Sequence, residues 1–175
     1  MLRVFADLVG FTSYCDQRDP HQVVETLQRV VEDFESVLGR WRDMQKIKTI
    51  GDGFMAAAGL SRLSDNPVRS CVACGLAMIE VAKELGEGWG LRVGVHIGPL
   101  VAGVLGHRQY LYDLFGDTVN TAARMEQMAR MNTVAVSEEA WHMVADIVDE
   151  SETVEVAVKG KGDLTVHFIS RLKPA

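Results

Sequence analysis

Hydrophobic and polar positions in the first half of the chain follow two periods, one of strands and one of helices. Residues 2–9 are mostly apolar and stop at Gly10, as in a buried strand. Asp19 and Pro20 have the residue types that open a helix, and the same holds for Asn66 and Pro67. The predicted elements are a strand at 2–9, a helix from 19–20 to about 41, strands near 45–50 and 54–58, and a helix from 66–67 to about 86.

The second half continues this alternation with shorter elements. They are a strand pair at 91–97 and 100–104 around Gly98 and Pro99, a helix at 118–131 capped by Asp117, a strand at 133–136, a short helix capped by Ser137, and strands near 153–158 and 165–170. Hairpins interleaved with helices favour an α+β fold over a doubly wound parallel sheet. Without an internal repeat or a linker, we expect one domain over residues 1–175. Because the first residues already belong to a core strand, we expect this domain to come from a longer protein.

Composition narrows the class of protein. The 175 residues are 47% hydrophobic and 24% charged, as in a globular domain. A net charge of -6 argues against a general nucleic-acid or membrane-binding surface, so any cationic site must be local. We expect a cytoplasmic domain that makes no membrane contact itself, although the parent protein could be membrane-attached. Three cysteines fit a reducing compartment, and Cys71 and Cys74 fall inside a helical pattern, which predicts buried packing rather than zinc binding.

Residues 46–54 place a cation and an acid on one predicted hairpin. Gly51, Asp52 and Gly53 form a turn that holds a carboxylate, and Lys48 lies four residues earlier. Strand alternation would put positions 48, 50 and 52 on one face at intervals of roughly 6 to 7 Å. That spacing suits a purine edge and its phosphates. The alternative is an ordinary hairpin with a solvated lysine.

Asp7 supplies a second acid, at the end of the first strand. A carboxylate on an apolar strand costs several kcal/mol unless it is paired, hydrogen-bonded or bound to a metal. Mg²⁺ is usually held by one or two carboxylates plus substrate phosphates, so Asp7 and Asp52 would suffice. The alternative is a strand-end aspartate that caps the next turn.

Three further segments carry polar groups that suit a nucleotide. Asn120 and Arg124 are separated by four residues, so a helix would project them from one face. Lys159 lies in a glycine-rich loop that could close over phosphate charge, and Arg92 begins a strand. Each of these also has an ordinary reading as a surface residue or solvated turn. His96 is expected to be a packed, hydrogen-bonded strand residue rather than a general base.

Five motifs together resemble the catalytic domain of the class III nucleotidyl cyclases. They are F-A-D-L-V-G-F-T, K-I-K-T-I-G-D-G-F, L-R-V-G-V-H-I-G, Y-D-L-F-G-D-T-V-N-T-A-A-R and V-K-G-K-G. Matches to the family are spread from Phe5 to Phe168. The resemblance implies a ferredoxin-like α+β core with a mainly antiparallel sheet and flanking helices. It also implies a head-to-tail homodimer with two active sites between the protomers.

The resemblance also assigns roles. From one protomer, Asp7, Asp52 and the carbonyl of Leu8 would bind two divalent ions, Mg²⁺ or Mn²⁺, and Arg92 would contact phosphates. From the other protomer, Lys48 and Asp113 would read the base, Asn120 would orient the ribose, Arg124 would stabilise the transition state and Lys159 would bind the terminal phosphates. Phe11, Thr12 and Leu114 would be further substrate contacts.

Lys48 and Asp113 favour ATP as the substrate. Adenine offers an amino donor and a ring-nitrogen acceptor, which an aspartate and a lysine complement, whereas guanine presents the reverse order. The expected function is therefore an adenylate cyclase that forms 3′,5′-cyclic AMP and pyrophosphate. The alternatives are a guanylate cyclase and a catalytically silent nucleotide-binding module.

Overall fold

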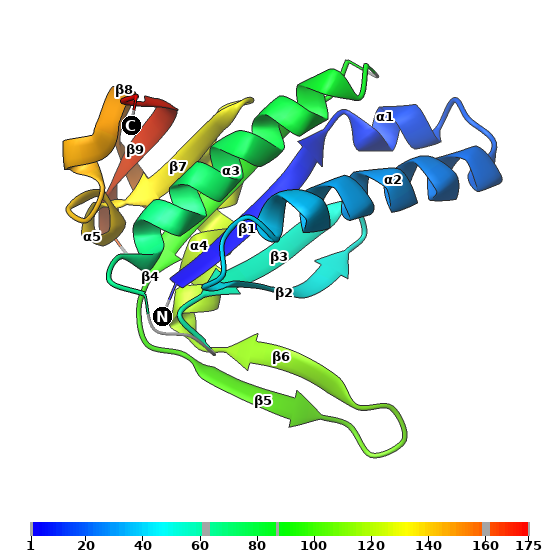
Figure 1. Ribbon diagram of the computed structural model, residues 1–175, viewed down its shortest axis with the longest axis horizontal. Coiled ribbons are helices and arrows are strands. Elements are labelled where there is room, and N and C mark those ends of the chain that lie inside the picture. Colours follow the sequence, from blue (N-terminus) through cyan, green and yellow to red (C-terminus); the bar gives the residue numbers. More distant parts are fainter. Residues whose placement is uncertain (1, 61–63, 87, 159–161, 175) are drawn as a thin grey trace.

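A seven-stranded sheet forms the centre of the molecule (Figure 1). The computed structural model describes residues 2–60, 64–86, 88–158 and 162–174. The sheet order is β2-β3-β1-β4-β7-β9-β8, and every neighbouring pair is antiparallel except β4 and β7. Its strands are β1 (Leu2–Val9), β2 (Met44–Ile50), β3 (Gly53–Ala58), β4 (Gly90–Ile97), β7 (Thr133–Ser137), β8 (Val148–Val158) and β9 (Gly162–Leu172). The α+β class predicted from the sequence is confirmed.

Two long helices, α2 (Pro20–Leu38) and α3 (Pro67–Glu84), cover one face of the sheet (Figure 1). With β1 to β4 they form a β-α-β-β-α-β unit, the element order of a ferredoxin-like core. Asp19 and Asn66 cap these helices as predicted, since their side chains accept hydrogen bonds from His21 N–H and Arg69 N–H. The ferredoxin-like expectation is therefore confirmed as well.

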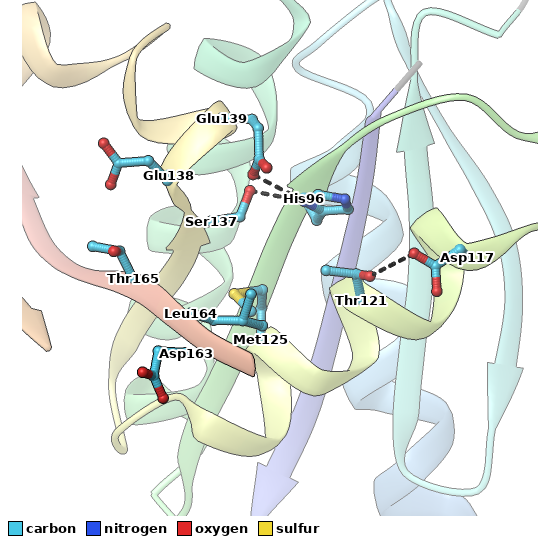
Figure 2. A pocket seen from close by; sticks show the side chains of 10 residues that line it. All are labelled: His96, Asp117, Thr121, Met125, Ser137, Glu138, Glu139, Asp163, Leu164 and Thr165. Atoms are coloured by element: carbon cyan, nitrogen blue, oxygen red, sulfur yellow. Dashed lines mark hydrogen bonds and ion pairs between the residues drawn. The ribbon is translucent and has the colours of Figure 1, made fainter. Parts of the chain in front are cut away.

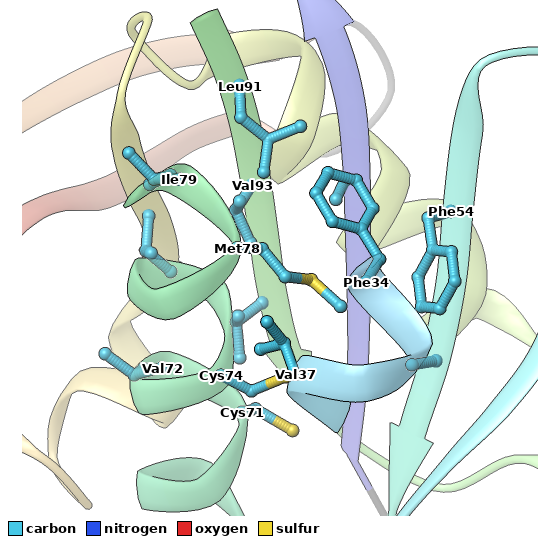
Figure 3. Packing of buried hydrophobic residues seen from close by; sticks show 14 of the residues in the cluster. Phe34, Val37, Phe54, Cys71, Val72, Cys74, Met78, Ile79, Leu91 and Val93 are labelled. Carbon is cyan, nitrogen blue, oxygen red and sulfur yellow. The ribbon is translucent and has the colours of Figure 1, made fainter. Parts of the chain in front are cut away.

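The main hydrophobic core lies between this sheet face and the two helices. Phe34 of α2 meets Phe54 of β3 edge-on at 5.7 Å between ring centroids, and Met78 of α3 packs beside them (Figure 3). Cys71 and Cys74 are fully buried in the same core, as predicted. Because side chains alternate across a strand, burial of alternate β1 positions here directs Asp7 to the opposite face.

The opposite face carries α4 (Asp117–Met128), which packs closely on β4 (Figure 1). A Cβ atom built on Gly94 of β4 would lie 2.1 Å from the backbone nitrogen of Glu126 and 2.5 Å from the carbonyl oxygen of Ala122. Only glycine therefore allows this approach of helix to strand. The remaining helices are α1 (Phe11–Cys15), α5 (Glu138–Trp141) and the 3₁₀ helix η1 (Ala145–Ile147).

Two predictions about the middle of the chain are wrong. The strand after Pro99 does not pair with β4, because both edges of β4 are taken by β1 and β7. Instead β5 (Val101–Leu105) pairs with β6 (Leu111–Phe115), which was not predicted, in a separate two-stranded arm (Figure 1). Asp117 is not the cap of α4: Gly116 occupies that position, and Asp117 lies in the first turn.

Element ends also differ from the predictions. α2 ends three residues before the predicted Trp41. β8 begins earlier than predicted, and β9 extends further than predicted at both ends. No helix among the described residues is long and apolar enough to cross a membrane.

Candidate functional site

An acidic cluster forms where β1 and β4 run side by side on the α4 face. Asp7 and Arg92 are direct cross-strand partners, and Arg92 Nη2 lies 2.7 Å from Asp7 Oδ2. Asp52 lies at the turn between β2 and β3, within the electrostatic reach of both residues. Burial raises the pKa of Asp52, a backbone hydrogen bond lowers it, and the negative charge of Asp7 raises it further. The structure therefore brings Asp7, Asp52 and Arg92 together, as the sequence predicted.

Glu126 belongs to the same cluster and was missed in the sequence. It lies on α4, its side chain is only 11% exposed, and its Oε1 is 2.9 Å from Arg92 Nε. Burial raises the pKa of this carboxyl group, and the Arg92 charge opposes that rise. The available signal was an acid among the apolar positions Ala122, Met125 and Ala129 of a predicted helix. We call Asp7, Asp52, Arg92 and Glu126 the acidic cluster.

The acidic cluster suits a hard divalent cation that also binds a second oxygen-rich group. Three carboxylates face a single guanidinium, so negative charge is in excess. The described residues contain no group of three or more His, Cys, Asp or Glu arranged to hold a metal unaided. Mg²⁺ commonly uses one or two carboxylates and takes its other ligands from water and phosphate. The donor set of Asp7 and Asp52 therefore fits Mg²⁺ or Mn²⁺ bound together with a polyphosphate.

A second group of predicted residues lines an open hollow of about 380 Å³, the Lys48 hollow. Lys48 Nζ lies 2.6 Å from Asp113 Oδ2, and the backbone N–H of Leu114 donates to Asp113 Oδ1 at 2.8 Å. Apolar side chains supply most of the remaining wall. The lining residues are Lys48, Ile50, Met55, Asp113, Leu114, Phe115, Gly116, Val119 and Asn120. A flat ligand would meet apolar walls and, at one edge, a donor beside an acceptor.

A β-bulge sets the direction of Lys48. The pairing of β2 with β3 shifts between Lys46 and Lys48, which leaves Ile47 as the extra residue. Lys46 consequently lies over the Phe54 ring and pairs with Glu35 on the α2 side, whereas Lys48 meets Asp113 on the other side. In a regular strand the two lysines would share a face.

The expectation that residues 48, 50 and 52 lie on one face is wrong. Lys48 and Ile50 line the hollow, but Asp52 belongs to the turn, where strand alternation no longer applies. The near charges of Asp52 are Asp7 and Arg92. Within one chain the acidic cluster and the Lys48 hollow are thus separate, since no member of the cluster lines the hollow.

α4 presents two more of the predicted residues. Asn120 is exposed at the rim of the Lys48 hollow, and Arg124 lies one turn further along. The Nη1 atom of Arg124 is buried and makes no hydrogen bond within the described part of the chain. A buried guanidinium donor without an acceptor is costly, which suits a group awaiting an anionic ligand.

The other predicted residues lie around β1 and at the end of the chain. Leu8 precedes the last residue of β1 and has a buried side chain. Phe11 and Thr12 open α1 directly after Gly10, and the Phe11 ring is buried against Trp89. Lys159 lies outside the described residues.

A further hollow, of about 350 Å³, contains none of the predicted site residues (Figure 2). It lies between α4, α5 and the start of β9, and half of its polar lining residues are acidic. His96 borders it and forms a 2.8 Å hydrogen bond between Nδ1 and the Ser137 hydroxyl (Figure 2). This contact agrees with the prediction that His96 is a packed, hydrogen-bonded strand residue.

The chain is similar in sequence and fold to nucleotide cyclases. The family described as "Adenylate and Guanylate cyclase catalytic domain" matches residues 3–171. An adenylate cyclase of Mycobacterium tuberculosis is 34% identical over 176 residues, covering 98% of this chain and 40% of that protein. The human guanylate cyclase soluble subunit beta-2 is 36% identical over 175 residues, covering 95% of this chain and 28% of that protein. The chain thus spans less than half the length of these relatives.

A solved structure agrees with these relatives. The guanylate cyclase domain of RhGC from Catenaria anguillulae, crystallised with GTP, superimposes with a TM-score of 0.92 at 28% identity and covers 98% of this chain and 96% of that one. Sequence and fold lead to the same assignment. The chain belongs to the family of adenylate and guanylate cyclase catalytic domains.

Proposed function

We propose that this domain is an adenylate cyclase, which converts ATP to 3′,5′-cyclic AMP and pyrophosphate in a homodimer. The ribose 3′ oxygen would attack the α-phosphorus, forming the new P–O bond while the bond to the β-phosphate oxygen breaks. The hydroxyl proton would leave to water or to a substrate phosphate oxygen. The observation that carries this proposal is the Lys48–Asp113 pair in the Lys48 hollow.

The pair offers a purine edge one donor and one acceptor. Lys48 Nζ would donate to N1 of adenine, and the Asp113 carboxylate would accept from the N6 amino group. Asp113 is oriented by the N–H of Leu114, and its bond to Lys48 would be exchanged for bonds to the base. Guanine would bring its O6 acceptor and N1 donor in the reverse order, and two like groups would face each other at each position.

The acidic cluster would hold the triphosphate end. Asp7 and Asp52, with the Leu8 carbonyl, are the residues that would bind two divalent cations. Bound there, the cations would lower the pKa of the 3′ hydroxyl and offset the charge of the leaving pyrophosphate. Arg92 and Lys159 would contact phosphate oxygens, and so would the amides of Phe11 and Thr12, which follow Asp7 and Leu8 closely in sequence. Asn120 would orient the ribose, and Arg124 would offset charge on the pentavalent phosphorus.

A homodimer would unite the two groups of residues. Within one chain the acidic cluster and the Lys48 hollow do not share a cavity, whereas a two-fold pairing can place each opposite the other group of its partner. The arm of β5 and β6 supports such a pairing because it exposes large apolar side chains. They are Val101, Val104, Leu105, Tyr110 and Leu111, each at least 57% exposed. Such a patch is characteristic of protein interfaces.

Exchanging the base-reading pair tests the substrate. In Lys48→Glu combined with Asp113→Cys, we expect the ratio of kcat/KM for ATP to that for GTP to fall by roughly 100-fold or more, because both hydrogen bonds to adenine are removed. The matched control is Lys46→Glu, which reverses the charge of the neighbouring lysine on the other sheet face and should leave the ratio unchanged.

Two results would contradict the proposal. ATP selectivity that survives the exchange would show that the pair does not read the base. Binding of a nonhydrolysable ATP analogue by the wild-type protein, with no cyclic product in Mg²⁺ or Mn²⁺, would instead favour a catalytically silent module.

A further inference from the structure

Arg92 is held by two carboxylates that come from different elements. Asp7 of β1 contacts the terminal Nη2 atom at 2.7 Å, and Glu126 of α4 lies 2.9 Å from Nε. Nε and Glu126 Oε1 are both buried, and the two atoms form a close ion pair rather than a well-aligned hydrogen bond. The Arg92 guanidinium is therefore paired with Glu126 at Nε and with Asp7 at the terminal Nη2.

The two carboxylates differ in what else they would do. Asp7 would turn to a cation in the working enzyme, and Arg92 would then lose its contact with that group. Glu126 is nearly buried on a helix, and within the described part of the chain Arg92 is its one ion-pair partner. With Nε fixed by Glu126, the outer nitrogens of Arg92 are free to move from Asp7 to a phosphate oxygen. An arginine fixed at one edge loses less entropy when it binds at the other.

The position of Glu126 is itself fixed by packing. Its backbone nitrogen lies against Gly94, two residues after Arg92 and on the same face of β4. The carboxyl group therefore reaches Nε from a helix that cannot move away without leaving this contact. This geometry makes Glu126 a rigid support for Arg92.

We infer that Glu126 is a positioning residue, which keeps Arg92 directed at the substrate phosphates when a divalent cation takes Asp7. The inference rests on the proposed function, because it takes Arg92 to be a phosphate contact. Glu126 acts only through Arg92 and binds neither the cation nor the nucleotide.

Glu126→Gln tests this role with little change of shape. We expect kcat to fall about 10- to 100-fold, the range seen when a supporting partner of a site residue is removed, with a smaller change in KM. The matched control is Glu152→Gln, which weakens an exposed arginine–glutamate pair with Arg130 that includes no member of the acidic cluster and should leave kcat unchanged.

A double-variant cycle shows whether Glu126 acts through Arg92. Lysine keeps the charge of Arg92 but has no Nε for Glu126 to hold, so Arg92→Lys should lose activity to a similar extent. Adding Glu126→Gln to Arg92→Lys should then change kcat by less than about threefold. A full additional loss in the double variant would show that Glu126 acts on its own and would overturn the inference.

A measurement without turnover separates this inference from the proposed function. In the wild-type protein with saturating Mg²⁺ and no nucleotide, the Arg92 Nε–H signal in a ¹H–¹⁵N spectrum should stay sharp, since Glu126 retains the group. The signal is assigned by its absence in Arg92→Lys, and it should broaden in Glu126→Gln. Loss of the wild-type signal on adding Mg²⁺ would overturn the inference.

The two proposals then have distinguishable failures. If the Arg92 Nε–H signal stays sharp with Mg²⁺ but the protein makes no cyclic nucleotide, the proposed function is wrong and the role of Glu126 as the support of Arg92 stands. If the wild-type enzyme is active and Glu126→Gln keeps both full kcat and a sharp Arg92 Nε–H signal, the inference about Glu126 is wrong and the proposed function stands. If Glu126→Gln does not fold, the wild-type spectrum, assigned with Arg92→Lys, still shows whether Arg92 Nε–H stays ordered when Mg²⁺ binds.

Discussion

The three cysteine residues differ in burial, and their thiols should therefore differ in reactivity. Burial raises the pKa of the Cys74 thiol to about 12 and that of Cys71 well above its ordinary value, while Cys15 is half-buried. Thiolates are the reactive form, and raised pKa values leave Cys71 and Cys74 protonated at pH 8. We expect Ellman's reagent to label about one thiol per native chain and all three thiols in denaturant.

Replacing the half-buried thiol provides the control for that measurement. Cys15→Ser should remove the labelling of the native protein and leave two thiols to appear on unfolding. Rapid labelling of two thiols in native Cys15→Ser would contradict the burial of Cys71 and Cys74.

Residues of the candidate site were easiest to identify where the sequence contains an anomaly. Asp7 stands out as an acid on an apolar strand, and Asp52 as an acid between two glycines. Asp113 was identified through a family motif. Glu126 was missed because a single acid in an amphipathic helix is usually a surface residue, although its place among apolar positions marks the buried face of that helix.

Helices and strands were predicted well where neighbouring residues determine the structure and poorly where pairing between distant strands determines it. Asp19 and Asn66 mark their helix starts because capping is a contact between near neighbours. The pairing of β5 depends on whether β4 still has a free edge, and that is settled by strands distant in sequence. The bulge at Ile47 likewise has no local signal, although it decides which lysine enters the hollow.

The contact between α4 and β4 gives a prediction at the element scale. Gly94→Ala would place a methyl group within 2.1 Å of the α4 backbone, so the helix must shift away. We expect the free energy of unfolding to fall by about 2 to 3 kcal/mol, as overpacking a rigid contact does. Urea denaturation measures it.

Another strand glycine serves as the control for this substitution. Gly103 of β5 has nothing within 4 Å of a built Cβ, so Gly103→Ala should change the stability by no more than about 0.5 kcal/mol. Equal stability of Gly94→Ala and wild type would mean that α4 does not rest on Gly94.

At the scale of the whole molecule, a shared active site predicts rescue between two inactive variants. Asp7→Ala damages the acidic cluster, and Asn120→Ala damages the rim of the Lys48 hollow. In a mixed dimer one site would carry both defects and the other neither. If equal amounts mix at random, half the dimers are mixed and each has one intact site, so about a quarter of the wild-type activity should return.

The pairing of the variants decides what such a rescue means. Asp7→Ala mixed with Asp52→Ala should stay inactive, because both defects fall in the same cluster and every mixed dimer has one defect in each site. Cyclic-nucleotide formation is followed after co-refolding, and native mass spectrometry counts the mixed dimers. If mixed dimers of Asp7→Ala and Asn120→Ala form and remain inactive, the two groups do not meet across a subunit interface. The exposed β5–β6 arm would then need a different binding partner, because its apolar side chains are not covered within the described part of one chain.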